Sequence, residues 1–129
     1  MSENKLSKPI GNLEEFRKHA KDEIMKFLDL PHDWDGYGGI PPKKQTVDDA
    51  WSIFDKLCYF MPVEIGVAGD GEIGLFYRQD EAYFNIACYG EGFYSYYGKF
   101  NDIEFFGDDL LVEKFPDDSF NELLLMLIK

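Results

Sequence analysis

The chain has 129 residues, of which 45% are hydrophobic and 17% aromatic, which excludes a disordered chain and suffices for one domain with a buried core. Its net charge of −12 argues against direct binding of nucleic acid, because Lys and Arg supply most of the affinity for phosphates. No apolar run approaches the ~20 residues of a transmembrane helix, so we expect no membrane association.

The N-terminal residues and the cysteines predict a cytoplasmic protein. We expect residues 1–11 to be flexible, and they lack the basic and then apolar plan of a signal peptide. Cys58 and Cys88 lie far apart within apolar stretches, which favours reduced core cysteines, with a disulfide as the alternative.

Two amphipathic helices are expected in the first half of the chain. Apolar residues recur at helical spacing from Leu13 to Leu28 and again from Thr46 to Tyr59. Each stretch begins with a capping-box pattern, Asn12 with Glu15 and Thr46 with Asp49. Both helices need a surface that covers their apolar stripes.

Between these helices lies the segment Trp34-Asp35-Gly36-Tyr37-Gly38-Gly39-Ile40-Pro41-Pro42. Glycine permits backbone angles that a Cβ forbids and proline fixes φ, so the segment predicts an ordered loop. Its aromatic residues have two interpretations. Trp34 and Tyr37 could line a pocket for a small molecule, or Trp34 packs in the core between the helices while the glycines fold the loop over it. The frequency with which a buried Trp anchors packing favours the second.

The middle of the chain predicts an antiparallel meander. Apolar residues alternate within 63–67, 73–77, 82–89 and 93–97, and the turns between them are too short for crossover helices. Residues 103–106 and 110–115 are expected to add one or two strands, with Gly107-Asp108-Asp109 as a turn. A last helix follows, with Ser119 and Glu122 as its capping box. The predicted fold is α+β, with four to six strands and helices mainly on one face.

The sequence predicts no catalytic, cofactor or metal site. His19 and His32 belong to no recognisable triad pattern. Asp33-Trp34-Asp35-Gly36 begins like a calcium loop, but Tyr37 occupies its fifth position and no Glu follows at the twelfth. Capping of backbone N–H groups is the better interpretation of these carboxylates. We therefore expect a protein that is not an enzyme.

Aromatic residues crowd the third turn and the fourth strand. By strand alternation, Phe93, Ser95 and Tyr97 share one face, and Tyr94 and Tyr96 the other. A tyrosine row on an open face, edged by acids, is typical of a protein-binding patch, whereas cross-strand packing is the structural alternative. The candidate partner-binding residues are Tyr89, Tyr94, Tyr96, Asp80, Glu81, Glu91, Asp102 and Glu104.

The chain from about residue 28 to residue 98 resembles a group of small bacterial and phage proteins. Those proteins carry Trp-Asp-Gly-Tyr-Gly-Ala-x-Pro-Pro, a helix, and a later Asp-Gly-x-Ile-x-Leu-x-Trp strand, which corresponds here to 70–77. Gly39 stands where Ala is usual in that group and Tyr77 where Trp is usual. The resemblance implies the fold and a bacterial or phage origin, and it transfers no site.

The charge is concentrated in one part of the chain. Residues 1–45 hold eight basic and eight acidic residues, whereas residues 46–129 hold five basic and seventeen acidic ones. Such an excess suits solubility or docking on a basic protein. We expect a non-enzymatic protein that covers a basic surface of a partner, as inhibitors, antitoxins, immunity proteins and anti-defence factors do. The alternative is a small-molecule-binding module that uses the Trp34 loop. A homodimer through a sheet edge or the tyrosine face is also open.

Overall fold

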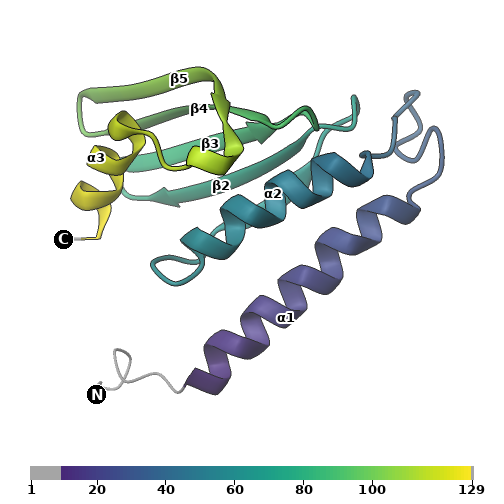
Figure 1. The fold of residues 1–129 in the computed structure, drawn as a ribbon, viewed down its shortest axis with the longest axis horizontal. Coiled ribbons are helices and arrows are strands. Elements are labelled where there is room, and N and C mark those ends of the chain that lie inside the picture. The colour runs from purple at the N-terminus through teal and green to yellow at the C-terminus, as the bar shows by residue number, and fades with distance from the viewer. Residues whose placement is uncertain (1–9, 129) are drawn as a thin grey trace.

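The computed structural model describes residues 10–128 (Figure 1). Its elements, in chain order, are α1 (Ile10–Lys26), η1 (Phe27–Asp29), α2 (Lys44–Leu57), β1 (Glu64–Val67), β2 (Ile73–Gln79), β3 (Ala82–Cys88), β4 (Phe93–Phe100), β5 (Ile103–Leu111), η2 (Val112–Lys114) and α3 (Asp118–Leu127). The α+β class, the antiparallel meander and the C-terminal helix are confirmed.

The strands follow one another in the order β1-β2-β3-β4-β5, and each pairs antiparallel with its neighbours. The register places Leu75, Ile86 and Tyr96 in one row across the sheet. Side chains of such a row point to the same face, because alternate residues of a strand face opposite sides. This row is buried.

All helices lie on the face of the sheet that carries this row (Figure 1). Helix α2 covers β2 and β3, α3 covers β4 and β5, and α1 packs on α2 as an outer layer. The largest fully buried side chains therefore come from both helices and strands: Tyr94, Phe54, Phe84, Phe120, Ile24, Ile53, Leu57, Ile73, Leu75, Ile86, Leu123 and Val47. Within the described residues, no helix covers the other face of the sheet.

Charged side chains fix α1 on α2. Arg17 donates a hydrogen bond from Nε to Oδ1 of Asp55 over 2.9 Å, and its guanidinium carbon lies 5.7 Å from the ring centroid of Trp51. Lys21, one turn further along α1, places its Nζ 4.8 Å from the same ring. Ala20 is buried in this contact layer. The packing of α1 thus combines apolar burial with an ion pair and cation–π contacts.

The helices do not begin at the predicted capping boxes. Asn12 lies within α1, α2 begins two residues before Thr46, and α3 begins one residue before Ser119. At α2, tertiary contacts involve both residues of the predicted capping box instead. Thr46 is buried against Gly90, and Asp49 accepts a hydrogen bond from the backbone N–H of Gly92.

The sequence prediction was also wrong about residues 103–115. Residues 103–111 form one strand, and Gly107-Asp108-Asp109 is no turn. The register between Tyr94 and Tyr96 shifts by one residue at Asp108 and Asp109, so they form a β-bulge. The backbone N–H of Asp109 donates to Oγ of Ser95 over 3.0 Å, which keeps the bulge on β4.

The predicted flexible segment, residues 1–11, falls mostly outside the described residues. Residues 1–9 are not described, and Ile10 and Gly11 belong to α1. No helix among residues 10–128 is both long and apolar enough to cross a membrane.

Candidate functional site

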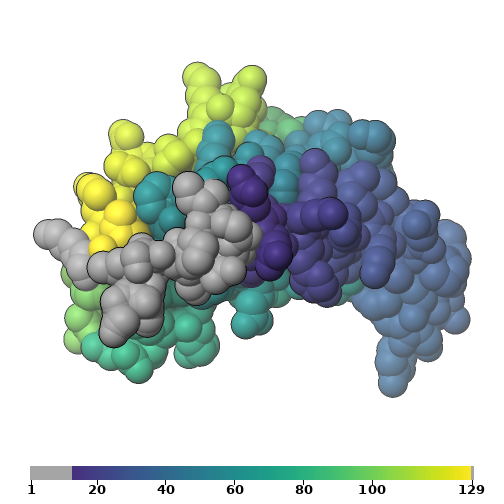
Figure 2. All heavy atoms as spheres, turned by 90° about the horizontal axis from the view of Figure 1, so that it is seen from below, coloured from purple at the N-terminus to yellow at the C-terminus, as the bar shows by residue number. Residues whose placement is uncertain are grey.

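The Trp34 segment lies at one end of the sheet, which we call the loop end. The loop end comprises the loop 30–43 and the turns 68–72 and 89–92, which join β1 to β2 and β3 to β4. Ile40 donates its backbone N–H to the carbonyl oxygen of Gly69 over 2.8 Å, so the loop is fixed to the first turn. Figure 2 shows the blue atoms of this loop projecting at the end of the molecule.

The loop forms a closed network of hydrogen bonds around its carboxylates. Oδ1 of Asp35 accepts from the backbone N–H groups of Tyr37 and Gly39, over 2.9 and 2.8 Å. Oδ1 of Asp33 accepts from the backbone N–H of Gly38 over 2.6 Å, and the backbone N–H of Asp33 donates to the carbonyl oxygen of Gly39. The predicted ordered loop, with carboxylates that cap backbone N–H groups, is confirmed.

Glycine is favoured at three positions of this loop for two different reasons. Gly36 and Gly38 have φ of 80°, in the left-handed region that side chains with a Cβ rarely adopt. A Cβ at Gly39 would lie 2.6 Å from Oδ1 of Asp35 and 2.8 Å from Nε1 of Trp34. Glycine at these positions therefore lets the loop close without backbone strain at 36 and 38 and without atomic overlap at 39.

The two aromatic residues of the loop have opposite environments. Trp34 is half-buried and donates from Nε1 to the carbonyl oxygen of Ile40 over 3.2 Å, and it is not among the side chains that form or border the hydrophobic core. The interpretation that Trp34 packs in the core between the helices is therefore wrong. Tyr37 is 93% exposed. Pro42 is buried and Pro41 half-buried, so the loop rejoins the body there.

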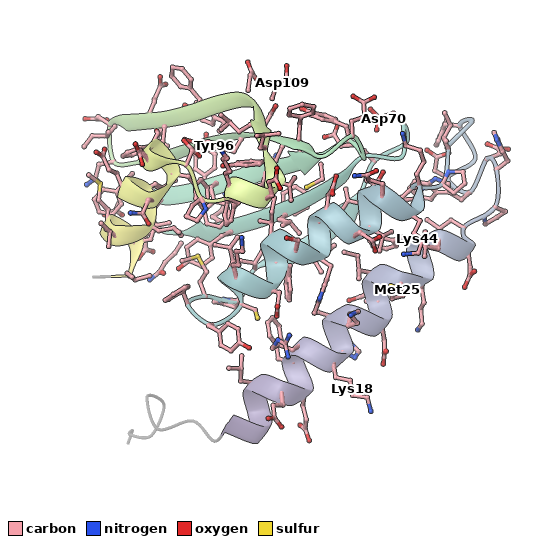
Figure 3. The ribbon with its side chains drawn as sticks, viewed as in Figure 1. Lys18, Met25, Lys44, Asp70, Tyr96 and Asp109 are labelled. Atoms are coloured by element: carbon pink, nitrogen blue, oxygen red, sulfur yellow. The ribbon has the colours of Figure 1, made fainter. Side chains whose placement is uncertain are left out.

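Acidic side chains are concentrated at the loop end, which also carries Tyr37. Five carboxylates belong to its loop and turns: Asp33, Asp35, Asp70, Glu72 and Glu91. Burial, and then the charge of Asp70, raise the pKa of Glu72. Lys43 and Lys44 are the cations nearest in the chain, and Lys44 pairs with Asp48 over 3.0 Å. Figure 3 shows Asp70 and Lys44 at this end.

Two predicted partner-binding tyrosines are inside the protein. Tyr94 is fully buried and Tyr96 is 5% exposed, so neither can contact a partner on the folded protein. The physical reason is that α3 covers their face of β4: the ring of Tyr96 lies 4.8 Å from that of Phe120, between the sheet and α3 (Figure 3). Both hydroxyls donate to the carboxylate of Asp117. The prediction that Tyr94 and Tyr96 belong to a partner-binding patch is therefore wrong.

The other predicted partner-binding residues are exposed but divided between two ends of the sheet. Tyr89, which is 39% exposed, and Glu91 lie at the loop end. Asp80, Glu81 and Asp102 lie in the turns at the opposite end, where Asn101 donates its backbone N–H to the carbonyl oxygen of Glu81. Glu104 is on β5 and accepts a hydrogen bond from the hydroxyl of Tyr97 over 2.9 Å. The predicted set is therefore not one surface.

An aromatic surface does exist on the sheet face opposite the helices, which we call the open face. The register places Phe76, Asn85, Tyr97 and Phe106 in one row across β2 to β5. Phe76 is 39% exposed and Phe106 is 67% exposed. In the adjacent row, Tyr83 lies 5.9 Å from Tyr97, ring to ring.

Sequence reasoning missed Phe76 and Phe106 as members of this surface. Their signal was present, because both occupy the strand positions that alternate with buried residues such as Leu75 and Phe105. Phe106 was assigned to a separate short strand, so its register with Tyr97 could not be inferred. Phe76 lies over two glycines, since a Cβ at Gly66 or Gly74 would come within 2.9 Å of its ring.

Within residues 13–128, no group of three or more His, Cys, Asp or Glu side chains is arranged to hold a metal ion. Comparison of the chain with protein-family models finds no match, and no curated protein or solved structure is significantly similar to it.

Proposed function

We propose that this chain is a non-enzymatic protein of the cytoplasm whose loop end docks on a basic surface of a protein partner. The observation that carries the proposal is Tyr37, which is 93% exposed on a loop with an internally hydrogen-bonded backbone. An ordered loop loses little conformational entropy on binding, and tyrosine is enriched among the residues that dominate binding energy.

The charge of the loop end supports a basic partner. Five carboxylates belong to the loop end that carries Tyr37, and one of the two neighbouring lysines, Lys44, already pairs with Asp48. Clustered charge of one sign steers and orients a partner of opposite sign. Acidic inhibitors, antitoxins, immunity proteins and anti-defence factors act in this way, and they are the classes to which we assign the chain under this proposal.

The geometry gives less support to a small-molecule site at the same loop. Small-molecule sites are concave and bury most of the surface of their ligand. Tyr37 instead projects into solvent, and the indole N–H of Trp34 is taken up by its own loop. A protein surface with a recess for one tyrosine is the better complement to this convex loop.

The proposal is tested by photo-crosslinking from two positions. The residue p-benzoylphenylalanine replaces Tyr37 in one protein and Tyr59 in the other; Tyr59 is 58% exposed and follows the far end of α2. Both proteins are irradiated in lysate of the source organism at low and high salt. We expect position 37 alone to crosslink one basic protein, with a yield that falls at high salt.

The crosslinked protein is then purified and its affinity measured by calorimetry. Tyr37→Ala should weaken binding by a factor on the order of 30 or more, as for a binding hot spot, while Tyr59→Ala leaves it unchanged. The proposal fails if position 37 gives no adduct, or only the adducts that position 59 also gives.

A further inference from the structure

The open face differs in charge from the rest of this acidic molecule. Outside the bulge, the strand residues that point to this face include two carboxylates, Glu64 and Glu104, and two cations, Arg78 and Lys99. The chain as a whole has a net charge of −12. The bulge carboxylates lie at the β5 edge, and Figure 3 shows Asp109 pointing outward beyond that strand. The centre of the open face is thus balanced in charge.

Three of these four charged groups lie beside other side chains of the open face. The guanidinium of Arg78 lies 4.8 Å from the ring centroid of Tyr83, and Lys99 stands directly opposite Glu104 in the register. Glu104 in turn accepts from the hydroxyl of Tyr97. A basic partner would find no net negative charge at the centre of this face. A surface with equal numbers of both charges around aromatic side chains is instead complementary to itself.

We propose that the open face is the interface of a homodimer, in which a second copy of this chain packs its own open face against the row Phe76, Tyr97 and Phe106. Two sheets packed in this way place their aromatic side chains between them, as in a β-sandwich. The dimer would cover the exposed part of Phe106, which no residue of the described chain covers.

The size of the face sets the strength of this dimer. The five strands are four to nine residues long, so that at about 4.8 Å between strands and about 3.3 Å per residue they cover roughly 500 Å² per copy. Two copies would then bury about 1,000 Å², which is the lower limit for a specific interface. We therefore expect a reversible dimer whose population rises with protein concentration.

The dimer and the complex with the proposed basic partner use different surfaces of the chain, and their stabilities respond oppositely to salt. Salt screens the repulsion between two copies of charge −12, so added salt should strengthen the dimer. The same salt should weaken a complex of the loop end with a basic protein. Failure of one proposal is therefore distinguishable from failure of the other.

The test is the mass of the full chain in solution, by sedimentation equilibrium over a wide range of concentration. We expect a shift from 15.0 kDa toward twice that mass. Phe106→Lys should raise the dissociation constant by a factor on the order of 30 or more. This variant lowers the net negative charge of each copy, so dimer loss could not result from added long-range repulsion between the two chains. Tyr37→Lys makes the same charge change at the loop end and should leave the dimer intact.

A second variant places the crosslink at the centre of the interface. Asn85 is the middle residue of the middle strand, so a two-fold axis through the open face brings both copies of it together. Asn85→Cys should give a covalent dimer with a short bis-maleimide, and Tyr37→Cys should not. A wild-type chain that stays at 15.0 kDa at every concentration overturns the proposal. So does a dimer that Phe106→Lys leaves unchanged.

Discussion

The hydroxyl of Tyr94 donates a hydrogen bond of 2.8 Å to Oδ1 of Asp117, and it accepts one of 3.2 Å from the backbone N–H of the same residue. Asp117 is the N-cap residue of α3. Tyr96 donates to the second carboxylate oxygen of Asp117 over 3.2 Å. Two tyrosines of β4 therefore hold the beginning of the C-terminal helix on the sheet.

Tyr94→Phe should lower the free energy of unfolding by about 1–3 kcal/mol, because Asp117 loses a donor to its carboxylate and the acceptor for its N–H. Urea denaturation monitored by circular dichroism measures this difference. Tyr97→Phe is the matched control, since its hydroxyl bonds to Glu104 on the open face. We expect a loss below about 0.5 kcal/mol for the control. Equal losses for the two variants would contradict a special role for Tyr94.

The same tyrosines should make stability fall at alkaline pH. Burial raises the pKa of Tyr94, with a further contribution from its hydrogen bond to Asp117, and burial raises the pKa of Tyr96 to about 12. The folded state therefore binds these protons more tightly than the unfolded state does. For Tyr96 this stabilisation is complete below pH ~10 and is lost as the pH rises toward 12. Each such group contributes a slope of about 1.4 kcal/mol per pH unit in that window.

Denaturation curves between pH 9 and pH 12 measure that slope, and Tyr96→Phe should make it shallower. Cys88 adds to the slope, because burial, and then the charges of Asp49 and Glu72, raise its pKa to about 12. Comparison of Tyr96→Phe with the wild type at each pH removes this common contribution. A slope that Tyr96→Phe does not change would show that the tyrosine ionises alike in the folded and unfolded states.

The position of Tyr94 illustrates what the sequence could and could not predict. Strand alternation correctly separated Tyr94 and Tyr96 from Phe93 and Tyr97. Alternation does not say which face the helices cover, because that depends on α3, whose first residue lies 24 positions after Tyr94 in the chain. Asp117, the half-buried partner of both hydroxyls, follows Tyr94 by 23 residues, and no local pattern links the two. The meander was predictable because short turns act locally.

The predictions for residues 107–109 and for the first residues of the helices were wrong for a related reason, because distant contacts decide both. Gly107-Asp108-Asp109 has the composition of a turn, yet β4 continues beside it, and the pairing of Asp109 with Ser95 holds it within β5. Thr46 and Asp49 have the spacing of a capping box, yet both contact the turn 89–92: Thr46 lies against Gly90, and Asp49 accepts a hydrogen bond from Gly92. The order of the Trp34 loop was predicted from its glycines and prolines, which restrict the backbone locally. The exposure of Tyr37 instead depends on where the loop meets Gly69.

Arg17→Ala should destabilise the protein by about 1 kcal/mol more than Lys18→Ala. The two substitutions remove the same charge from neighbouring positions of α1. Arg17 loses its ion pair with Asp55 and its contact with Trp51, and a half-exposed pair of this kind is worth about 1 kcal/mol. Figure 3 shows Lys18 pointing away from α2.

Urea denaturation at low and high salt measures the difference between these two variants. It should shrink at high salt, because the ion pair is partly exposed and salt screens it. If Lys18→Ala proved as destabilising as Arg17→Ala, the docking of α1 on α2 would depend on net charge rather than on these contacts.

Gly39→Ala should release the Trp34 loop, whereas Gly36→Ala should only strain it. The new Cβ at position 39 would overlap Oδ1 of Asp35 and Nε1 of Trp34, which hold the loop together, so these side chains must move. A Cβ at position 36 meets no atom within 4 Å, and its cost is the left-handed φ alone, about 1 kcal/mol.

Hydrogen exchange measured by mass spectrometry over residues 33–40 separates the two effects. We expect Gly39→Ala to accelerate exchange there by at least about tenfold relative to Gly36→Ala, which corresponds to one further lost hydrogen bond of about 1.4 kcal/mol. Faster exchange in Gly36→Ala than in Gly39→Ala would mean that backbone strain, and not the close approach of Asp35 and Trp34, determines the order of the loop.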